Sequence, residues 1–145
     1  MKNKLAKHRI KIFFKKILKD LLFDQNTISS TIVGSFSETF NFKNVGDIDV
    51  VLICKKITRK YYKDYIKIIK MQKNKLLQLS DKKNLKINTT FGPIKFDNSK
   101  TLIIHLMIYD YNSHVKHALA SPFTCYDWQR SNFYCENKLE KIFSI

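Results

Sequence analysis

Apolar residues recur every three or four positions along residues 4–23, and lysines fill many of the positions between them. This period places the apolar residues on one side of a helix and the lysines on the other. The same period predicts a second long helix over residues 58–79, and residues 113–120 and 126–143 are expected to form further helices. We interpret the lysine-rich sides as solvent-exposed faces and expect the apolar sides to pack on a sheet.

Apolar runs between these helices predict strands. The predicted strands are Ile28–Gly34, Asp47–Cys54, Leu85–Phe91, Ile94–Phe96 and Thr101–Asp110. Gly92 and Pro93 separate the third and fourth strands and indicate a tight turn. Because short turns join antiparallel strands, we predict an α/β (α+β) chain with a mixed, largely antiparallel sheet of four to five strands. The helices are expected to pack on one face of this sheet.

The chain has the size and composition of one folded domain. Its 145 residues, 44% of them apolar, can bury a single ordinary core, so residues 1–145 are expected to form one domain. No apolar run reaches the length of about 18 residues that a membrane-spanning helix needs, and the basic N-terminus lacks the apolar core of a secretory signal. Three cysteines without C-x-x-C spacing are typical of reduced thiols. We therefore expect a cytoplasmic protein without a membrane partner.

The formal net charge is +15, from 27 lysines and arginines against 12 acidic residues. A charge of this sign and size is typical of proteins that bind nucleic acid or polyphosphates. However, only Arg9, Arg59 and Arg130 are arginines, and arginine is the usual residue for paired contacts with bases and phosphates. An excess of lysine, asparagine and isoleucine also arises from an AT-rich coding sequence without selection for binding. Both interpretations of the charge stay open.

The residues with the clearest chemistry lie between the first two predicted strands. Gly34 and Ser35 end the first strand. Asp47 and Asp49 begin the second strand. Carboxylates two residues apart on a strand point to the same face, where they can hold Mg²⁺ or Mn²⁺ together with phosphate oxygens. Gly34 allows close approach of a ligand to the backbone, and Ser35 offers a hydroxyl and an amide to a phosphate, more so if residues 36–42 begin a helix.

On these residues the chain resembles the nucleotidyltransferase superfamily, which includes DNA polymerase beta. The matching motifs are Val33-Gly34-Ser35 and, after a spacer, Asp47-Ile48-Asp49-Val50. The resemblance implies a nucleotidyltransferase-like fold and transfer of a nucleoside monophosphate from a nucleoside triphosphate to a hydroxyl group. It also implies that Asp47 and Asp49 bind metal, that Gly34 and Ser35 hold phosphates, and that a third carboxylate on a later strand completes a two-metal site.

The chain departs from this superfamily on the predicted strand Thr101–Asp110. The superfamily would place an acid in the middle of that strand, where this chain has His105. Asp110, the only acid in the strand, is the alternative for the third position. It lies five residues from His105, so a regular strand would turn it to the opposite face unless a bulge or the strand end brings it back. Three roles are open to His105: ligand to a transition metal, catalytic base, or structural histidine bonded to a neighbouring carbonyl.

Two functions follow from these patterns. The first is a metal-dependent nucleotidyltransferase with Asp47, Asp49 and His105 as catalytic residues and an unidentified hydroxyl acceptor. The second is a catalytically impaired module of the same fold that binds nucleic acid or a protein partner through its lysine-rich surface. Because few residues follow the last predicted strand, we expect the acceptor of an active enzyme to be small or to be bound by a partner protein.

Overall fold

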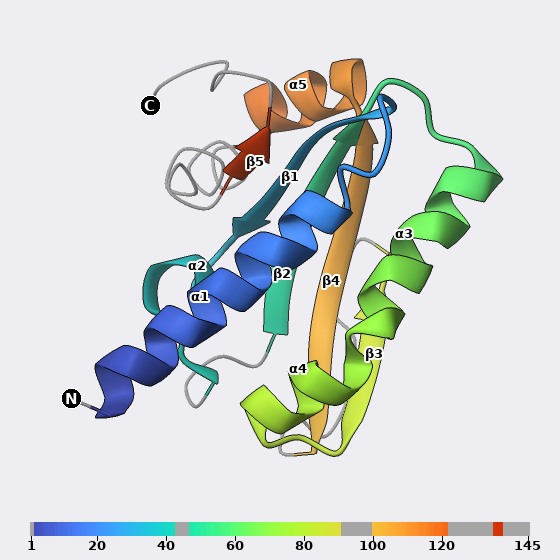
Figure 1. The fold of residues 1–145 in the computed structure, drawn as a ribbon. Coiled ribbons are helices and arrows are strands. Elements are labelled where there is room, and N and C mark those ends of the chain that lie inside the picture. Colours follow the sequence, from blue (N-terminus) through green and yellow to red (C-terminus); the bar gives the residue numbers. More distant parts are fainter. Residues whose placement is uncertain (1, 43–46, 91–99, 122–134, 138–145) are drawn as a thin grey trace.

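The computed structural model describes residues 2–42, 47–90, 100–121 and 135–137 (Figure 1). The helices are α1 (Lys2–Asp20), α2 (Phe36–Thr39), α3 (Arg59–Met71), α4 (Lys73–Ser80) and α5 (Tyr111–Ala120). The strands are β1 (Thr27–Val33), β2 (Asp47–Cys54), β3 (Asn84–Asn88), β4 (Thr101–Asp110) and β5 (Cys135–Asn137). β2 and β4 have the predicted bounds, because each is a nearly continuous apolar run. Among the described residues, none of the helices combines the length and the apolar character that crossing a membrane requires.

The five strands form one mixed sheet in the order β3-β4-β2-β1-β5. β1 pairs antiparallel with β2 and β5, whereas β4 pairs parallel with β2 and β3. The predicted α+β class and mixed sheet are confirmed, but the prediction of a largely antiparallel sheet is wrong. The error comes from the short turns, such as the one at Gly92 and Pro93, that are expected between successive later strands. β3 and β4 are neighbours that run parallel, and a tight turn cannot join such a pair. Residues 91–99, with this turn and the strand predicted at Ile94–Phe96, lie outside the described residues.

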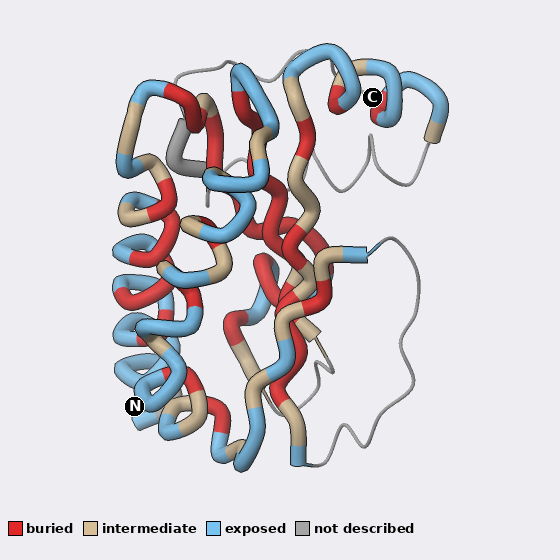
Figure 2. The backbone as a smooth tube through the Cα atoms, turned by 90° about the vertical axis from the view of Figure 1, so that its right-hand side faces the viewer, coloured by how far each residue is buried: buried red, intermediate tan, exposed pale blue. Residues whose placement is uncertain are grey.

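Helices α1, α3 and α4 cover one face of the sheet, and the main core lies between them and the strands (Figure 1, Figure 2). The strands contribute alternate residues to this core, among them Ile48, Val50 and Leu52 of β2. Phe14 of α1 packs edge-on against Phe36 of α2, with ring centroids 5.1 Å apart. The residues between these core positions face the other side of the sheet, and the polar groups described below lie there.

Helix α5 departs from the expected arrangement of helices on one face. It packs on Tyr109 of β4 through His114 and His117, whose rings lie 5.5 and 5.6 Å from the tyrosine ring. Tyr109 belongs with Val51 and Ile53 to a second apolar cluster, formed by alternate residues on the face opposite the main core. The prediction of helices on one face is therefore wrong for α5, which follows β4 directly and packs on the nearest apolar residue of that opposite face.

Two further helix predictions are corrected. The helix predicted over residues 58–79 is two helices, α3 and α4, which meet at Gln72 with φ −95° and ψ 8°. This conformation lies outside the α-helical region, and the Gln72 amide donates to the carbonyl of Ile69 three residues back, which tightens the last turn of α3. The helix predicted over residues 126–143 is wrong at Cys135–Asn137, because these residues pair with the edge of β1. The rest of that range lies outside the described residues.

Candidate metal and active site

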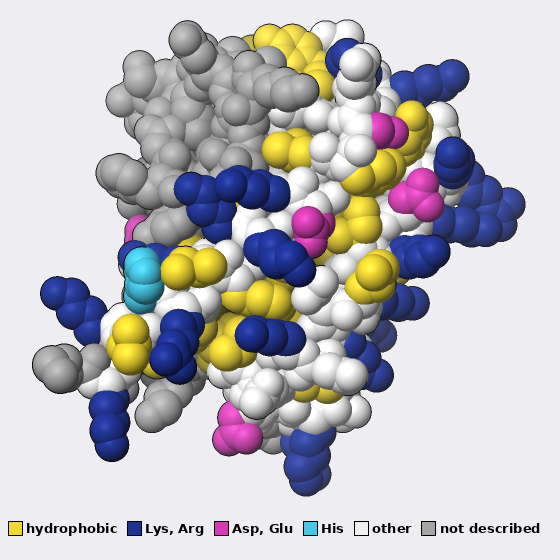
Figure 3. Space-filling view, in the orientation of Figure 1, with side chains coloured by type: hydrophobic (Ala, Val, Ile, Leu, Met, Phe, Trp, Pro, Cys, Tyr) yellow, Lys and Arg dark blue, Asp and Glu magenta, His cyan; other side chains and the backbone are white. Residues whose placement is uncertain are grey.

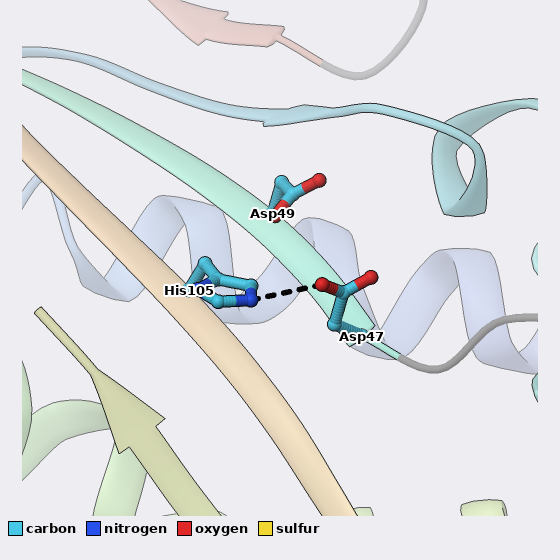
Figure 4. A group of neighbouring side chains, drawn as sticks. All are labelled: Asp47, Asp49 and His105. Carbon is cyan, nitrogen blue, oxygen red and sulfur yellow. Dashed lines mark ion pairs between the residues drawn. The ribbon is translucent and has the colours of Figure 1, made fainter. Parts of the chain in front are cut away.

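Three polar side chains converge on the face of the sheet turned away from α1 (Figure 4). Asp47 and Asp49 come from β2, and His105 comes from the neighbouring strand β4. One potential ligand atom from each side chain lies within 4.8 Å of the others, and no other such group of three occurs among the described residues. The fold therefore brings together the three residues that the sequence predicts as catalytic.

The register of the two parallel strands explains this convergence. Asp49 lies directly opposite His105, and Asp47 lies opposite Ile103. Since side chains alternate between the faces of a sheet, Asp47, Asp49 and His105 share one face. Ile48, between the two aspartates, is 1% exposed and packs in the main core. Burial of Ile48 thus fixes the side of the sheet to which both carboxylates point.

Gly34 brings the turn between β1 and α2 against the carboxylate of Asp49. It has φ +77°, a backbone conformation that favours glycine. A Cβ atom added at Gly34 would lie 2.6 Å from Oδ2 of Asp49, closer than real contacts of this kind allow. The sequence predicts a close approach at this glycine, and in the structure the group that approaches is the Asp49 carboxylate.

Ser35 is exposed at the start of α2, a helix of a single turn. The amides of Ser37 and Glu38 donate to the carbonyls of Gly34 and Ser35, respectively. The Ser37 hydroxyl also donates to the Gly34 carbonyl at 2.6 Å and stabilises the turn. Ser35 therefore follows Gly34 at the edge of the site, and the helix considered over residues 36–42 is limited to Phe36–Thr39.

Both ring nitrogens of His105 have partners. Nε2 lies 2.8 Å from Oδ2 of Asp47, and Nδ1 lies 2.9 Å from Nδ2 of Asn88 on β3. The side chain of His105 is 18% exposed, whereas that of Asp47 is 43% exposed, so Asp47 is the more accessible to an ion from solvent. These contacts differ from those of a structural histidine bonded to a carbonyl, one of the three roles considered from sequence.

Asn88 is a part of this site that the sequence analysis misses. It is 3% exposed, and it lies opposite His105 in the parallel pairing of β3 with β4. The sequence predicts a turn between Leu85–Phe91 and Ile94–Phe96 and no pairing of β3 with β4, so it does not identify the neighbour of Asn88 on β4. The only signal in the sequence is a polar residue at the end of a short strand, and such a residue does not by itself indicate a site.

Asp110, the alternative to His105, lies at the other end of β4. It pairs with Cys54, whereas Asp47 is at the opposite end of β2. Its carboxylate accepts a hydrogen bond from the Ser113 amide at 2.7 Å, and this bond lowers the pKa of Asp110. Asp110 is therefore the N-cap of α5, and His105 is the β4 residue beside the two aspartates.

Two of the three candidate ligands, the carboxylates of Asp47 and Asp49, are of the kind that hard divalent cations bind. Carboxylate oxygens are the ligands that Mg²⁺ and Mn²⁺ prefer, whereas imidazole nitrogen suits later transition metals. Asp47 and Asp49 supply such oxygens from one face of β2, and the glycine at position 34 makes room for the Asp49 carboxylate beside the turn. The two aspartates therefore fit the predicted Mg²⁺ or Mn²⁺.

Comparisons with protein-family models, with curated proteins and with solved structures found no match to this chain. The resemblance of its motifs to the nucleotidyltransferase superfamily therefore stays a prediction. The function has to be inferred from the site itself, which consists of Asp47, Asp49 and His105 with Gly34 and Asn88 beside them.

Proposed function

We propose that this protein is a metal-dependent nucleotidyltransferase that transfers a nucleoside monophosphate from a nucleoside triphosphate to a hydroxyl acceptor. The observation that carries the proposal is the convergence of Asp47, Asp49 and His105 beside the Gly34 turn. Two carboxylates on one strand, next to a glycine turn that ends the neighbouring strand, form the arrangement that the sequence motif predicts.

Each residue has a defined part in this proposal. Asp47 and Asp49 would hold Mg²⁺ or Mn²⁺ through carboxylate oxygens. The bound cation would supply charge neutralisation at the triphosphate and make the acceptor hydroxyl more acidic. His105, 2.8 Å from Asp47, orients that carboxylate. Gly34 and Ser35 would lie beside the phosphates, with the Asp49 carboxylate in the space that the lack of a side chain on Gly34 leaves.

The replacement of a third carboxylate by His105 changes the charge of the site. Asp47 and Asp49 bring two negative charges, whereas three carboxylates would bring three. Each carboxylate removed lowers the attraction for a second divalent ion. We therefore expect one firmly bound cation rather than two.

Titration with Mn²⁺ in the presence of a labelled nucleoside triphosphate tests the proposal. Asp47→Asn and Asp49→Asn keep the shape of the side chains and remove their charge, so each should weaken metal-dependent triphosphate binding by about tenfold or more. Asp81→Asn is the matched control, because it removes the same charge at the exposed end of α4. Binding that needs no metal, or equal losses in all three variants, would contradict the proposal.

A second candidate function is binding of nucleic acid through the helical face. Basic side chains gather on that face, over α1, α3 and α4 (Figure 3). Helix α1 alone carries seven lysines and one arginine, against Asp20 as its single acidic residue. Such a face would attract a phosphate backbone, and a catalytically impaired protein of this fold would still possess it.

Salt dependence tests this second function. Fluorescence anisotropy with a single-stranded RNA should show that the affinity falls steeply with salt, with a slope of about 0.7 for each phosphate neutralised. Lys7→Gln and Lys19→Gln on α1 should weaken binding. Lys86→Gln should not, because Lys86 lies on β3 two residues from Asn88 and shares its face of the sheet. Affinity that is insensitive to salt, or equal effects of all three variants, would rule out binding by this face.

A further inference from the structure

The orientation of the Asn88 side chain is set by Thr90. Oδ1 of Asn88 accepts hydrogen bonds from the Thr90 amide at 3.0 Å and from the Thr90 hydroxyl at 2.7 Å. A backbone amide can only donate, so the Asn88 atom that faces it must be the carbonyl oxygen. The amide nitrogen Nδ2 of Asn88 is therefore the atom that faces His105.

This orientation determines where the neutral ring of His105 carries its proton. An amide nitrogen donates and cannot accept, so Nδ1 of His105, 2.9 Å from Nδ2 of Asn88, must be the unprotonated acceptor. The proton of the ring is then on Nε2, which lies 2.8 Å from Oδ2 of Asp47. Hydrogen bonds thus run in one direction, from Thr90 to Asn88, from Asn88 to His105, and from His105 to Asp47.

A histidine that binds a metal through Nε2 needs the opposite tautomer. Its Nε2 lone pair must face the metal, and Nδ1 then carries the proton, which it typically donates to a carboxylate or a carbonyl. Asn88 presents a donor at this position. With the proton on Nδ1, two N–H groups would point at each other, and Asn88 would have to give up its bonds with Thr90 to turn round.

We propose that Asn88 is a positioning residue that keeps His105 as a hydrogen-bond donor to Asp47 and prevents His105 from becoming a metal ligand. The inference rests on the metal site of the proposed function. If His105 is not a ligand, only the carboxylate oxygens of Asp47 and Asp49 bind the metal. Zn²⁺ and Co²⁺ gain more from an imidazole ligand than Mg²⁺ and Mn²⁺ do, so a site of oxygen ligands alone loses much of its preference for Zn²⁺ and Co²⁺. Asn88 would thereby determine which class of metal the site selects.

Asn88→Asp is the variant that allows a proton on Nδ1 of His105 with the smallest change in shape. Its Oδ1 can still accept both hydrogen bonds from Thr90, and its second carboxylate oxygen accepts from Nδ1–H of His105. A metal can then replace the proton on Nε2, because Nδ1–H of His105 has an acceptor, as in the carboxylate–histidine–metal arrangement of many proteins.

The first measurement needs no metal. Long-range ¹H–¹⁵N NMR of the histidine rings separates protonated from unprotonated nitrogens. Loss of a signal in His105→Gln assigns His105 among the four histidines. We expect Nε2 to carry a proton and Nδ1 to carry none in the unmodified protein, and we expect Nδ1 to carry a proton in Asn88→Asp. Protonated Nδ1 in the unmodified protein would overturn the proposal, even if the variant does not fold.

The second measurement is the ratio of the affinities for Zn²⁺ and Mn²⁺, determined by calorimetry. It compares four proteins: the unmodified protein, Asn88→Asp, His105→Gln and the double variant. The added negative charge raises affinity for both ions, so the ratio is the readout. We expect Asn88→Asp to shift this ratio toward Zn²⁺ by about tenfold or more, and the shift to disappear in the double variant. An unchanged ratio, or a shift that survives the loss of His105, would refute the role of Asn88 in metal choice.

The two measurements separate this inference from the proposed function. If no metal binds but Nε2 is protonated, the proposed function and the metal selectivity fail together, while Asn88 keeps its role in fixing the tautomer. If Mn²⁺ and triphosphate bind but Nδ1 is protonated, the proposed function stands and the role of Asn88 is refuted.

Discussion

Replacement of Gly34 by alanine tests whether the glycine turn and the Asp49 carboxylate depend on each other. Gly34 has φ +77°, and an L-residue in the left-handed region costs about 1–2 kcal/mol. The new Cβ would also lie 2.6 Å from Oδ2 of Asp49. That oxygen is at the end of a short side chain, so we expect the carboxylate to rotate away while β1 and β2 stay paired.

The backbone strain sets the size of the expected effect. Gly34→Ala should lower the free energy of unfolding by about 1–2 kcal/mol. For a chain of this length each kcal/mol corresponds to about 2–4 °C, so Tm should fall by about 2–8 °C in a circular-dichroism melt. Rotation of Asp49 should weaken Mn²⁺ binding in the same protein, which calorimetry can measure.

Asp49→Ala supplies the control background for this experiment. It removes the atom that the new Cβ would meet, but it leaves the strain of a positive φ at position 34. Gly34→Ala should therefore still destabilise the Asp49→Ala protein, and any larger loss in the presence of Asp49 measures the contact itself. If Gly34→Ala changes neither Tm nor Mn²⁺ affinity, the close approach of turn and carboxylate is refuted.

Three further changes test the fold around the site. Leu52→Ala removes a side chain that is 0% exposed, so urea denaturation should show a loss of about 2–5 kcal/mol, and a loss below this range would contradict the packing of β2 in the main core. Tyr65→Phe deletes a buried hydroxyl 2.7 Å from the Thr27 hydroxyl, so it should cost about 1–3 kcal/mol in the same assay, and an unchanged midpoint would contradict this bond. Asp110→Ala removes the cap of α5. Because the Ser113 amide lowers the pKa of Asp110, the stabilisation is present at neutral pH and is lost as the pH falls through the lowered value, so melts of the two proteins should differ at neutral pH and converge in acid.

The sequence predicts the parts of the site that depend on local patterns. The bounds of β2 and β4 follow from two apolar runs, and the spacing of Asp47 and Asp49 puts both on one face of any strand. Placing His105 beside them required the resemblance to a known superfamily, because the pairing of β2 with β4 joins segments far apart in the chain. In the structure this pairing sets Asp49 opposite His105.

The parts that the sequence does not predict depend on the direction of strand pairing or on the conformation of one residue. Gly92 and Pro93 favour a turn, and nothing local shows that β3 and β4 run parallel. Asn88 reaches His105 only in that parallel register, so the residue that sets the tautomer could not be found. The break at Gln72 between α3 and α4 was missed because the helical period of apolar residues continues across it.

The two candidate functions use opposite faces of one sheet, and this separation decides how they can be combined. Ile48 of β2 packs in the main core on the side of the helices, while Asp47 and Asp49 face the other side. The layer of helices and the sheet would both lie between the carboxylates and a nucleic acid bound across α1. Such a nucleic acid could present a hydroxyl to Asp47 and Asp49 only by passing around an edge of the sheet. If the two sites are independent, lysine variants on α1 should weaken only nucleic-acid binding, and Asp47→Asn should weaken only metal-dependent triphosphate binding. If the lysine variants also reduce nucleotidyl transfer to an RNA end, while metal binding is unchanged, the bound strand reaches around the edge and the RNA is the acceptor.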